Sequence, residues 1–272
     1  MNENPITVRR IVVGLILAVF GLATVVFPWA FYVLTLGIGV AAIYELNGLC
    51  KIKGQEVEYS VSVLGVAAYI VLAALGMLHK WEGVLIAAII IATFSLGMYG
   101  AEKGYFARTA YTLLSVLYIG KLLTYWVFIR SIPGDGMLFT FYAVVLIALT
   151  DILGMVVGTF LGRHPMTTIS PKKTYEGSIG ALLLVTAIGS LLALRPELHL
   201  TWWQGGLVGA ITSIAAQAGD LVESALKRDA GVKDAGDAIQ GHGGVLDRFD
   251  SYLFGGMAFF GGLHLLGILS VQ

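Results

Sequence analysis

Long apolar runs separated by short polar segments make up most of the chain. A run of about 20 apolar residues can cross the roughly 30 Å hydrocarbon core of a membrane as a helix. We expect nine such runs, at 11–27, 29–46, 60–78, 83–99, 109–129, 137–159, 178–195, 204–223 and 250–270. The pattern therefore predicts an all-α, polytopic integral membrane protein with about nine transmembrane helices.

The first apolar run follows Arg9 and Arg10, and a basic start followed by an apolar run is also typical of a signal peptide. This run continues to Phe27 without a small-residue cleavage site, and Pro28 separates it from the next run. We therefore interpret it as a retained first helix, because a cleaved signal would end in such a site.

Composition supports the membrane class. The 272 residues are 57% apolar and 12% charged, and the mean hydropathy is +0.85. Soluble domains are about 45–50% apolar and about 25% charged. The formal net charge is zero, so charge indicates no nucleic-acid partner. The single cysteine, Cys50, excludes a disulfide within the chain.

The distribution of lysine and arginine predicts the orientation in the membrane. Nine spans place the N-terminus on the same side as segments 46–60, 100–108, 160–177 and 224–249. That side contains thirteen basic residues and the opposite side contains three. Because basic loops stay in the cytoplasm, we expect the N-terminus and segment 224–249 to face the cytosol of a bacterial-type inner membrane.

The densest group of charges lies in the C-terminal half. We divide the chain into N-terminal transmembrane helices, 1–130, and a C-terminal catalytic region, 131–272, with cytosolic loops at 160–177 and 224–249. Residues 224–250 read SALKRDAGVKDAGDAIQGHGGVLDRFD and contain nine charged residues between two apolar runs. Such a cluster is costly beside a membrane unless it faces water or binds an ion, so we expect the functional site there.

A helical extension of the 204–223 run would align several of these polar residues. Residues three, four and seven apart share a helix face, which groups Asp220, Glu223, Ser224 and Lys227. A carboxylate, a hydroxyl and a base in this order could bind a metal-bound polyphosphate. A solvated helix end with i,i+4 ion pairs is the alternative interpretation.

The segment GHGGVLDRFD forms a second polar array. Gly243 and Gly244 allow a close backbone approach to an anion, and His242 could contact phosphate or act in acid–base chemistry. Asp247 and Asp250 are three residues apart, on one face of the last predicted helix.

Carboxylates from two helices could share one cation. Asp220 and Asp247 are the candidates, and a shared ion would clamp a phosphoryl group. Carboxylate oxygens favour Mg²⁺ or Mn²⁺ over zinc.

Three further features leave alternatives open. The basic segment with Lys172 and Lys173 could anchor the chain to anionic lipid or form a phosphate-binding lid. Asp151 lies inside an apolar run, where a carboxylate normally faces a cavity, pairs with a base or binds a cation. Lys121 could extend to the membrane interface or belong to a polar site.

The charged C-terminal segment resembles the signature of the phosphatidate cytidylyltransferase family, also called CDP-diacylglycerol synthases. The upstream ISPKKTYEG, residues 169–177, is similar to the SPKKTxEG element of that family. Gln240 stands where the family usually has proline. The matching positions are Ser224, Lys227, Arg228, Lys233, Asp234, Gly236, His242, Gly243, Gly244, Asp247, Arg248 and Asp250.

The resemblance implies that CTP and phosphatidate react to give CDP-diacylglycerol and pyrophosphate in phospholipid biosynthesis. For this reaction, our hypothesis assigns Asp220 and Asp247 to Mg²⁺, with Asp250 as a further ligand or a partner of the ligands, and it leaves room for a second cation such as K⁺. The implied phosphate-binding residues are Lys172, Lys173, Ser224, Lys227, Arg228, Lys233, His242, Gly243, Gly244 and Arg248, with Asp234 orienting one of the bases.

Two other functions stay open at this point. A CTP-dependent polyprenol or lipid kinase also needs an intramembrane polar site, and a different lipid product would distinguish it. An ion-coupled transporter could also use intramembrane carboxylates, although the chain has no obvious repeated halves. The expected partners are CTP, phosphatidate and membrane lipids, and a homodimer is left open.

Overall fold

The computed structural model describes residues 19–99, 104–236 and 243–269. Within these ranges no β-strand is present, and extended pairing is limited to an isolated bridge between Pro165 and Thr174. The predicted residues Arg9, Arg10 and His242 lie outside the described residues.

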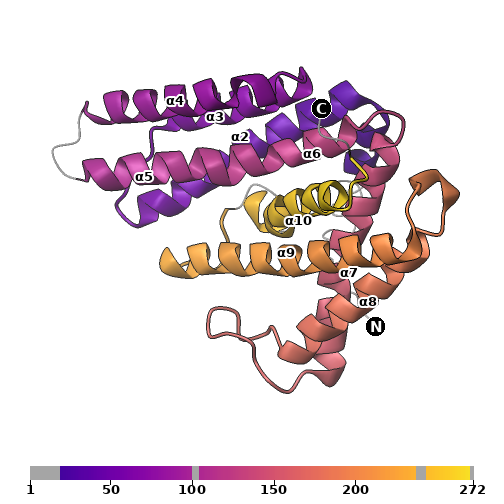
Figure 1. The fold of residues 1–272 in the computed structure, drawn as a ribbon. Coiled ribbons are helices and arrows are strands. Elements are labelled where there is room, and N and C mark those ends of the chain that lie inside the picture. The colour runs from indigo at the N-terminus through magenta and orange to yellow at the C-terminus, as the bar shows by residue number, and fades with distance from the viewer. Residues whose placement is uncertain (1–18, 100–103, 237–242, 270–272) are drawn as a thin grey trace. The chain divides into compact units, whose positions relative to one another are not determined.

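The regular elements are helices that follow one another with short connections (Figure 1). In chain order they are α2 (Pro28–Ile52), α3 (Tyr59–Ala74), α4 (Leu78–Gly97), α5 (Tyr105–Ser115), the π-helix η1 (Val116–Lys121), α6 (Leu122–Arg130), α7 (Gly136–Leu161), α8 (Tyr175–Leu192), the 3-10 turn η2 (Pro196–Leu198), α9 (Trp202–Asp229) and α10 (Leu246–Leu265).

Six helical segments in the described residues are long and apolar enough to cross a membrane. They are α2, α4, the continuous α5–η1–α6 segment, α7, α8 and α9. The apolar helix α3 is shorter, with 16 residues. The predicted all-helical fold is confirmed, and these apolar helices mark an integral membrane protein. The total of nine spans stays a prediction.

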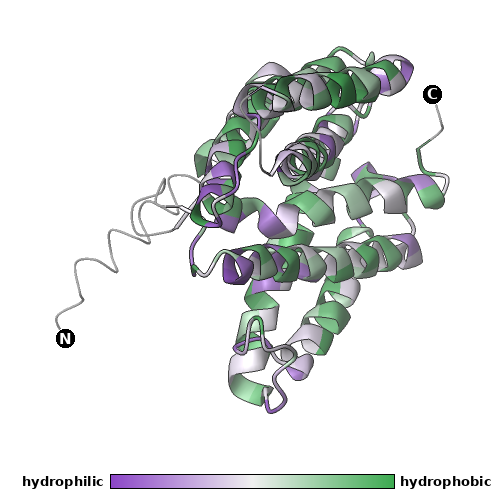
Figure 2. Cartoon of the chain, turned by 90° about the vertical axis from the view of Figure 1, so that its left-hand side faces the viewer, coloured by the Kyte–Doolittle hydropathy of each residue, from purple (hydrophilic) through white to green (hydrophobic). Residues whose placement is uncertain are grey.

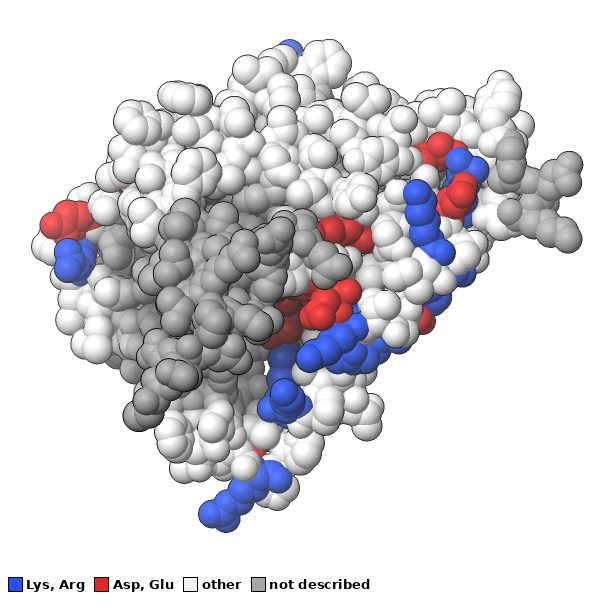
Figure 3. All heavy atoms as spheres, turned by 180° about the vertical axis from the view of Figure 1, so that it is seen from behind, with Lys and Arg blue, Asp and Glu red and all other residues white. Residues whose placement is uncertain are grey.

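The outer surfaces of the helices suit a lipid environment. Large apolar side chains point outward, and the side chains of Phe106 and Phe160 are more than four-fifths exposed. Apolar residues continue around most helices in Figure 2, and broad areas of the face in Figure 3 have no charged side chain. Contiguous apolar surface of this kind marks contact with lipid or another protein.

The charged loop predicted over 224–249 is shorter than expected. Helix α9 continues to Asp229, two turns beyond the predicted apolar run, and α10 begins at Leu246. Gly231 then adopts a positive φ of 73°, a conformation that glycine reaches at little cost. The hydropathy pattern predicted the end of this helix too early, because α9 continues beyond its apolar part. The added turns contain an ion pair within the helix, between Glu223 and Lys227.

The chain forms two compact units. The N-terminal unit comprises residues 1–127 and 230–248, and the C-terminal unit comprises residues 128–229 and 249–272. The signature segment after α9 is therefore part of the N-terminal unit, although most of the catalytic candidates before it belong to the C-terminal unit.

In the N-terminal unit, α3 packs against α2, α4, α5 and η1. Small residues allow these helices to approach closely. A Cβ atom added to Gly65 would lie 2.8 Å from Val116 Cγ1, and one added to Gly120 would lie 3.1 Å from the Val66 Cα. The hydroxyl groups of Ser62 and Ser115 hydrogen-bond at 2.8 Å in the buried contact between α3 and α5.

Lys121 ends the π-helix η1 and forms an ion pair with Glu82 of α4. Its ammonium group also lies 5.6 Å from the centre of the Tyr125 ring, within cation–π range. A charged residue in an apolar helix is usually paired in this way. This contact gives Lys121 a partner inside the unit, so an extension to the membrane interface is not needed to explain it.

In the C-terminal unit, α8 packs against both α7 and α9, and α7 also contacts α9. The Tyr142 hydroxyl donates to the Gly189 carbonyl oxygen at 2.9 Å and lies 3.2 Å from that of Gly205. The ring of Phe259 on α10 packs edge-on against Tyr142, with ring centres 5.6 Å apart. These contacts build the helical frame around a cavity.

Candidate functional site

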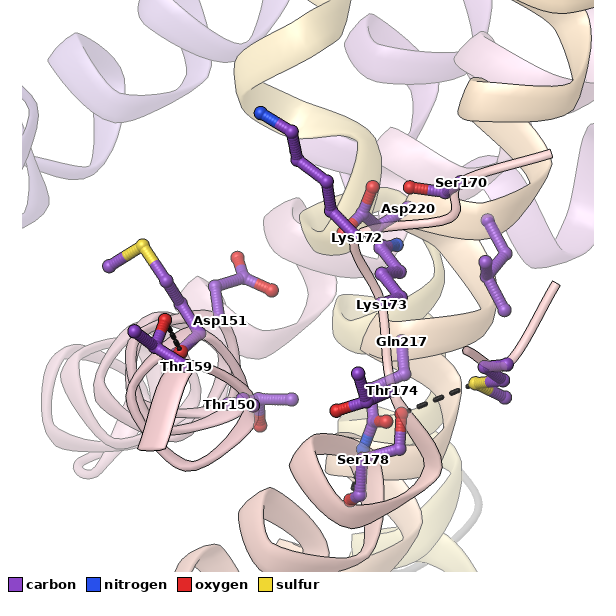
Figure 4. A pocket seen from close by; sticks show the side chains of 15 residues that line it. Thr150, Asp151, Thr159, Ser170, Lys172, Lys173, Thr174, Ser178, Gln217 and Asp220 are labelled. Atoms are coloured by element: carbon purple, nitrogen blue, oxygen red, sulfur yellow. Dashed lines mark hydrogen bonds and ion pairs between the residues drawn. The ribbon is translucent and has the colours of Figure 1, made fainter. Parts of the chain in front are cut away.

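The C-terminal unit contains a cavity of about 510 Å³ (Figure 4). It is lined by α7, α8, α9 and the segment between α7 and α8. Its charged lining residues are Asp151, Lys172, Lys173 and Asp220. A cavity of this size with convergent charges inside an apolar helix bundle is a candidate binding site for a charged ligand.

Lys173 and Asp220 meet in this cavity. The Lys173 Nζ atom lies 2.5 Å from Asp220 Oδ2, and roughly a quarter to a third of each side chain is exposed. Figure 4 shows Lys173 directed at Asp220, whereas Lys172 extends in another direction. The structure thus brings together one residue from each of two predicted site segments. Their contact places Lys173 at the cavity, and both interpretations of the basic segment, lipid anchor and phosphate-binding lid, stay predictions.

The basic segment is held at its base by Glu176 of α8. Glu176 Oε2 accepts the backbone N–H groups of Arg163 at 3.1 Å and His164 at 3.2 Å. The His164 Nδ1 atom lies 2.5 Å from Glu176 Oε1. One carboxylate therefore ties the start of the segment to the first turn of the helix at its end.

Backbone contacts within the segment fold it into a narrow hairpin. The Met166 N–H donates to the Lys173 carbonyl oxygen at 2.8 Å, and the Lys173 N–H donates to that of Ser170 at 3.0 Å. The Thr174 side chain caps α8 by accepting the Gly177 N–H at 3.1 Å, which is a typical N-cap arrangement. Lys172 and Lys173 are thus presented from a constrained turn.

Asp151 of α7 lines the same cavity, which fits the first of its sequence alternatives, and its binding of a cation stays a prediction. Its Oδ1 atom accepts a hydrogen bond from the Ser251 hydroxyl of α10 at 3.1 Å. Asp220 lies within electrostatic range of both Asp151 and Asp250. Asp250 is 8% exposed and accepts the Ser251 N–H at 2.6 Å. Ser251 therefore bridges Asp151 and Asp250, and Asp220 lines the same cavity as Asp151.

The last turns of α9 confirm the predicted helical face. The Lys227 Nζ atom lies 2.6 Å from Glu223 Oε2, an i,i+4 pair in which the Glu223 side chain is fully buried. The Arg228 Nε–H donates to the carbonyl oxygen of Ile169, within the basic segment, at 3.4 Å. The described residues that line the cavity do not include Ser224, Lys227 or Arg228.

The rest of the predicted signature lies in the N-terminal unit. Asp247 Oδ2 accepts the N–H groups of Ala235 at 2.9 Å and Gly244 at 2.8 Å, which closes a loop. Gly243 in that loop has a positive φ of 81°. Lys233, Asp234 and Arg248 are exposed on the same segment.

The sequence prediction missed two polar residues that line the cavity and one buried carboxylate that contacts the start of α10. Gln217 and Ser178 line the cavity, and the Gln217 Nε2 group donates to the Ser178 carbonyl oxygen at 3.3 Å. Glu45 of α2 is 4% exposed and accepts the N–H groups of Val245 and Leu246, both at 2.7 Å. Glu45 could have been noticed because it is a carboxylate inside an apolar run, like Asp151.

The carboxylates of the C-terminal unit are the chemically suitable ligands for a divalent cation. Asp151, Asp220 and Asp250 offer only oxygen donors, which fit a hard ion such as Mg²⁺. Among the described residues, however, no group of three or more acidic, histidine or cysteine side chains has metal-ligand spacing. Asp247 belongs to the other unit, so its sharing of a cation with Asp220 stays a prediction.

These features are those of an all-helical membrane protein with a charged cavity lined by lysine and aspartate. The comparisons with known proteins then identify its family. Residues 7–266 match the model described as the Cytidylyltransferase family, and the chain belongs to that family.

Curated relatives support this assignment over most of the chain. A phosphatidate cytidylyltransferase of Bacillus subtilis (strain 168) is 32% identical over 253 residues, which covers 90% of this chain and 93% of that protein. A phosphatidate cytidylyltransferase of Staphylococcus aureus (strain COL) is 32% identical over 240 residues, covering 86% and 87%. One from Staphylococcus haemolyticus is 40% identical over 168 residues, covering 61% of each chain.

Proposed function

We propose that this chain is a phosphatidate cytidylyltransferase that converts CTP and phosphatidate into CDP-diacylglycerol and pyrophosphate. The observation that supports it most directly is the Lys173–Asp220 pair in a charged cavity within an apolar helix bundle. The names of the relatives point to the same reaction, and the alignment with one of them covers nine-tenths of the chain.

The proposed chemistry is a nucleotidyl transfer. An oxygen of the phosphatidate phosphate attacks the α-phosphorus of CTP and forms a new P–O bond. The bond from that phosphorus to the oxygen bridging to the β-phosphate breaks, and pyrophosphate leaves with the electron pair. The attacking oxygen is already an anion at neutral pH, so a strong general base is not required. Bringing two anions together is the main obstacle, and it calls for cations and fixed orientation.

The cavity residues can meet that requirement. Lys172 and Lys173 are positioned by the hairpin and the Glu176 clamp, and each adds one positive charge near the ligand. Asp220 orients the Lys173 ammonium group while no phosphate is bound. A preorganised cation costs no reorganisation when charge develops during the reaction. We assign Lys172 and Lys173 to the phosphates of either substrate.

A divalent cation completes the proposal. Mg²⁺, or Mn²⁺ in its place, would neutralise phosphate charge when bound, and a second cation such as K⁺ is part of the same hypothesis. Asp220 and Asp250 offer suitable oxygen donors on this unit, and Asp247 is the third residue of the predicted set. Lys227, Arg228, Lys233 and Arg248 are further candidates for phosphate binding, together with Ser224, His242, Gly243 and Gly244.

The membrane setting suits the two substrates. Phosphatidate can keep its acyl chains in lipid and present its phosphate at the interface, while CTP arrives from water. The lining of the cavity contains both charged groups and apolar ones such as Met155 and Leu221. From the thirteen-to-three distribution of basic residues, we propose an inner-membrane location with the N-terminus and the site facing the cytosol.

Product formation by the purified full-length chain tests the reaction. Phosphatidate, labelled CTP and Mg²⁺ are supplied to wild type, Lys173→Met, Asp220→Asn and Asp247→Asn, with Lys80→Met as a control lysine outside the cavity. We expect labelled CDP-diacylglycerol and pyrophosphate from wild type and the control, and roughly 100-fold less from the three site variants. Chelation of divalent cations should abolish the product.

Other outcomes would point elsewhere. A phosphorylated lipid together with CDP would indicate a CTP-dependent lipid kinase. Folded wild type that releases no nucleotide product would favour the transporter. Full activity of Asp220→Asn and Asp247→Asn would retain the reaction and refute the metal assignment.

A further inference from the structure

Glu45 is a buried carboxylate that the reaction scheme above does not use. It lies near the C-terminal end of α2, and only 4% of the residue is exposed. Burial of a carboxylate costs several kcal/mol unless hydrogen bonds satisfy it. Both oxygens of Glu45 are satisfied: Oε1 accepts the Val245 N–H and Oε2 accepts the Leu246 N–H, each at 2.7 Å.

These two amides lie at the start of α10. The first N–H groups of a helix have no acceptor inside the helix, and a side-chain oxygen just before it usually supplies one. Here the preceding residues Gly243, Gly244 and Val245 have no side-chain oxygen. Glu45, 200 positions earlier in the chain, takes that role, and its negative charge also suits the positive end of the helix dipole.

The loop also packs closely around this carboxylate. A Cβ atom at Gly236 would lie 3.0 Å from Glu45 Cγ, and one at Gly244 would lie 2.6 Å from Glu45 Cδ. A side chain at either position would therefore push against the Glu45 carboxylate, most strongly at Gly244. Asp247 then closes the loop by accepting the Ala235 and Gly244 amides.

We propose that Glu45 is a positioning residue: it holds the start of α10, residues 243–247, in the conformation that the cytidylyl transfer requires. The activity part of this inference rests on the proposed function, whereas the structural part does not. Glu45 acts through Asp247 and the loop backbone, both in its own unit. Without it, the Val245 and Leu246 amides lose their acceptors, and residues 243–247 gain freedom.

Hydrogen exchange combined with kinetics tests the proposal on the full chain in detergent. The variants are Glu45→Gln, which keeps the shape, and Glu45→Ala, with Glu56→Gln as the control because the Glu56 side chain is 68% exposed. We expect at least tenfold faster exchange at residues 243–248 in both Glu45 variants. Exchange in α7 and α8, and all rates in the control, should stay unchanged.

Enzyme kinetics distinguish a positioning role of Glu45 from a simple loss of folded protein. Both Glu45 variants should lower kcat per folded molecule at least tenfold, with a larger change in the Mg²⁺ concentration needed for half-maximal rate than in the KM for phosphatidate. Gly236→Ala should show the same pattern by displacing Glu45. In a Glu45→Ala background the added methyl group has room, so Gly236→Ala should cause little further loss.

The possible results decide whether Glu45 has this positioning role. Unchanged exchange and kcat in Glu45→Ala would refute it, and so would additive effects of Glu45→Ala and Gly236→Ala. If the variants fail to fold, exchange in wild type decides: fast exchange of Val245 and Leu246 amides would refute the anchor, and slow exchange would support it. The two parts can also separate. If the Glu45 variants show faster exchange at residues 243–248 but wild type makes no CDP-diacylglycerol, the structural role of Glu45 is supported and the proposed function is refuted.

Discussion

Lys173 forms a direct ion pair with Asp220, 47 residues later, with 2.5 Å between Nζ and Oδ2. One residue comes from the hairpin before α8 and the other from the polar end of α9. The contact joins two segments that were singled out independently from the sequence. It also defines the part of the cavity where a phosphate could exchange with a carboxylate as the partner of the lysine.

The Lys173–Asp220 pair should show energetic coupling. Lys173→Met or Asp220→Asn alone leaves one charge without its partner, whereas the double variant removes both charges. Because the side chains are partly exposed, we expect a coupling of about 1 kcal/mol in unfolding free energy. Thermal unfolding of the four proteins in one detergent measures it. Strictly additive losses would show that the pair contributes nothing to stability.

Removal of the Glu176 clamp should weaken CTP binding more than it weakens the fold. Glu176→Gln loses the charge that holds His164 and two backbone amides, so the hairpin with Lys172 and Lys173 becomes less constrained. We expect the KM for CTP to rise roughly tenfold, with a small change in Tm. Glu197→Gln, an exposed acidic change in η2, is the control. An unchanged KM would contradict the positioning role of Glu176.

The Lys121–Glu82 pair should matter for stability and not for catalysis. Lys121→Met leaves the Glu82 carboxylate without this partner between apolar helices, and we expect a loss of about 1–3 kcal/mol. The double variant Lys121→Met with Glu82→Gln should recover part of that loss, because no lone charge is left. Tm and activity per folded molecule are the measurements. A fall in kcat at unchanged Tm would instead place Lys121 in a functional site.

The close approach of α7 and α8 should depend on Gly177. A Cβ atom there would lie 2.7 Å from the Gly154 carbonyl oxygen and 3.0 Å from Gly158 Cα, so Gly177→Ala should destabilise the chain by about 1–3 kcal/mol. Gly261 of α10 has no heavy atom within 4 Å of such a Cβ. Gly261→Ala is the matched control, and it should be neutral or slightly stabilising. Equal Tm values for both variants would contradict this packing.

Local information in the sequence was enough to predict the helices and several neighbours within them. Apolar runs identified α7, α8 and α9 because a membrane helix must expose apolar residues along its whole length. The i,i+4 spacing of Glu223 and Lys227 predicted a shared face, and the two side chains form an ion pair at 2.6 Å. The end of α9 at Asp229 was missed, because hydropathy does not register a helix that continues into polar residues.

Contacts between distant segments were decided by tertiary structure alone. No sequence spacing connects Glu45 with Val245, or Lys173 with Asp220, and Gln217 has no distinguishing sequence context. Sequence patterns predict which residues are apolar, helical or charged, since these properties are local. Which buried charges satisfy one another depends on how the helices pack, because burial of a carboxylate is tolerated only where packing supplies its donors.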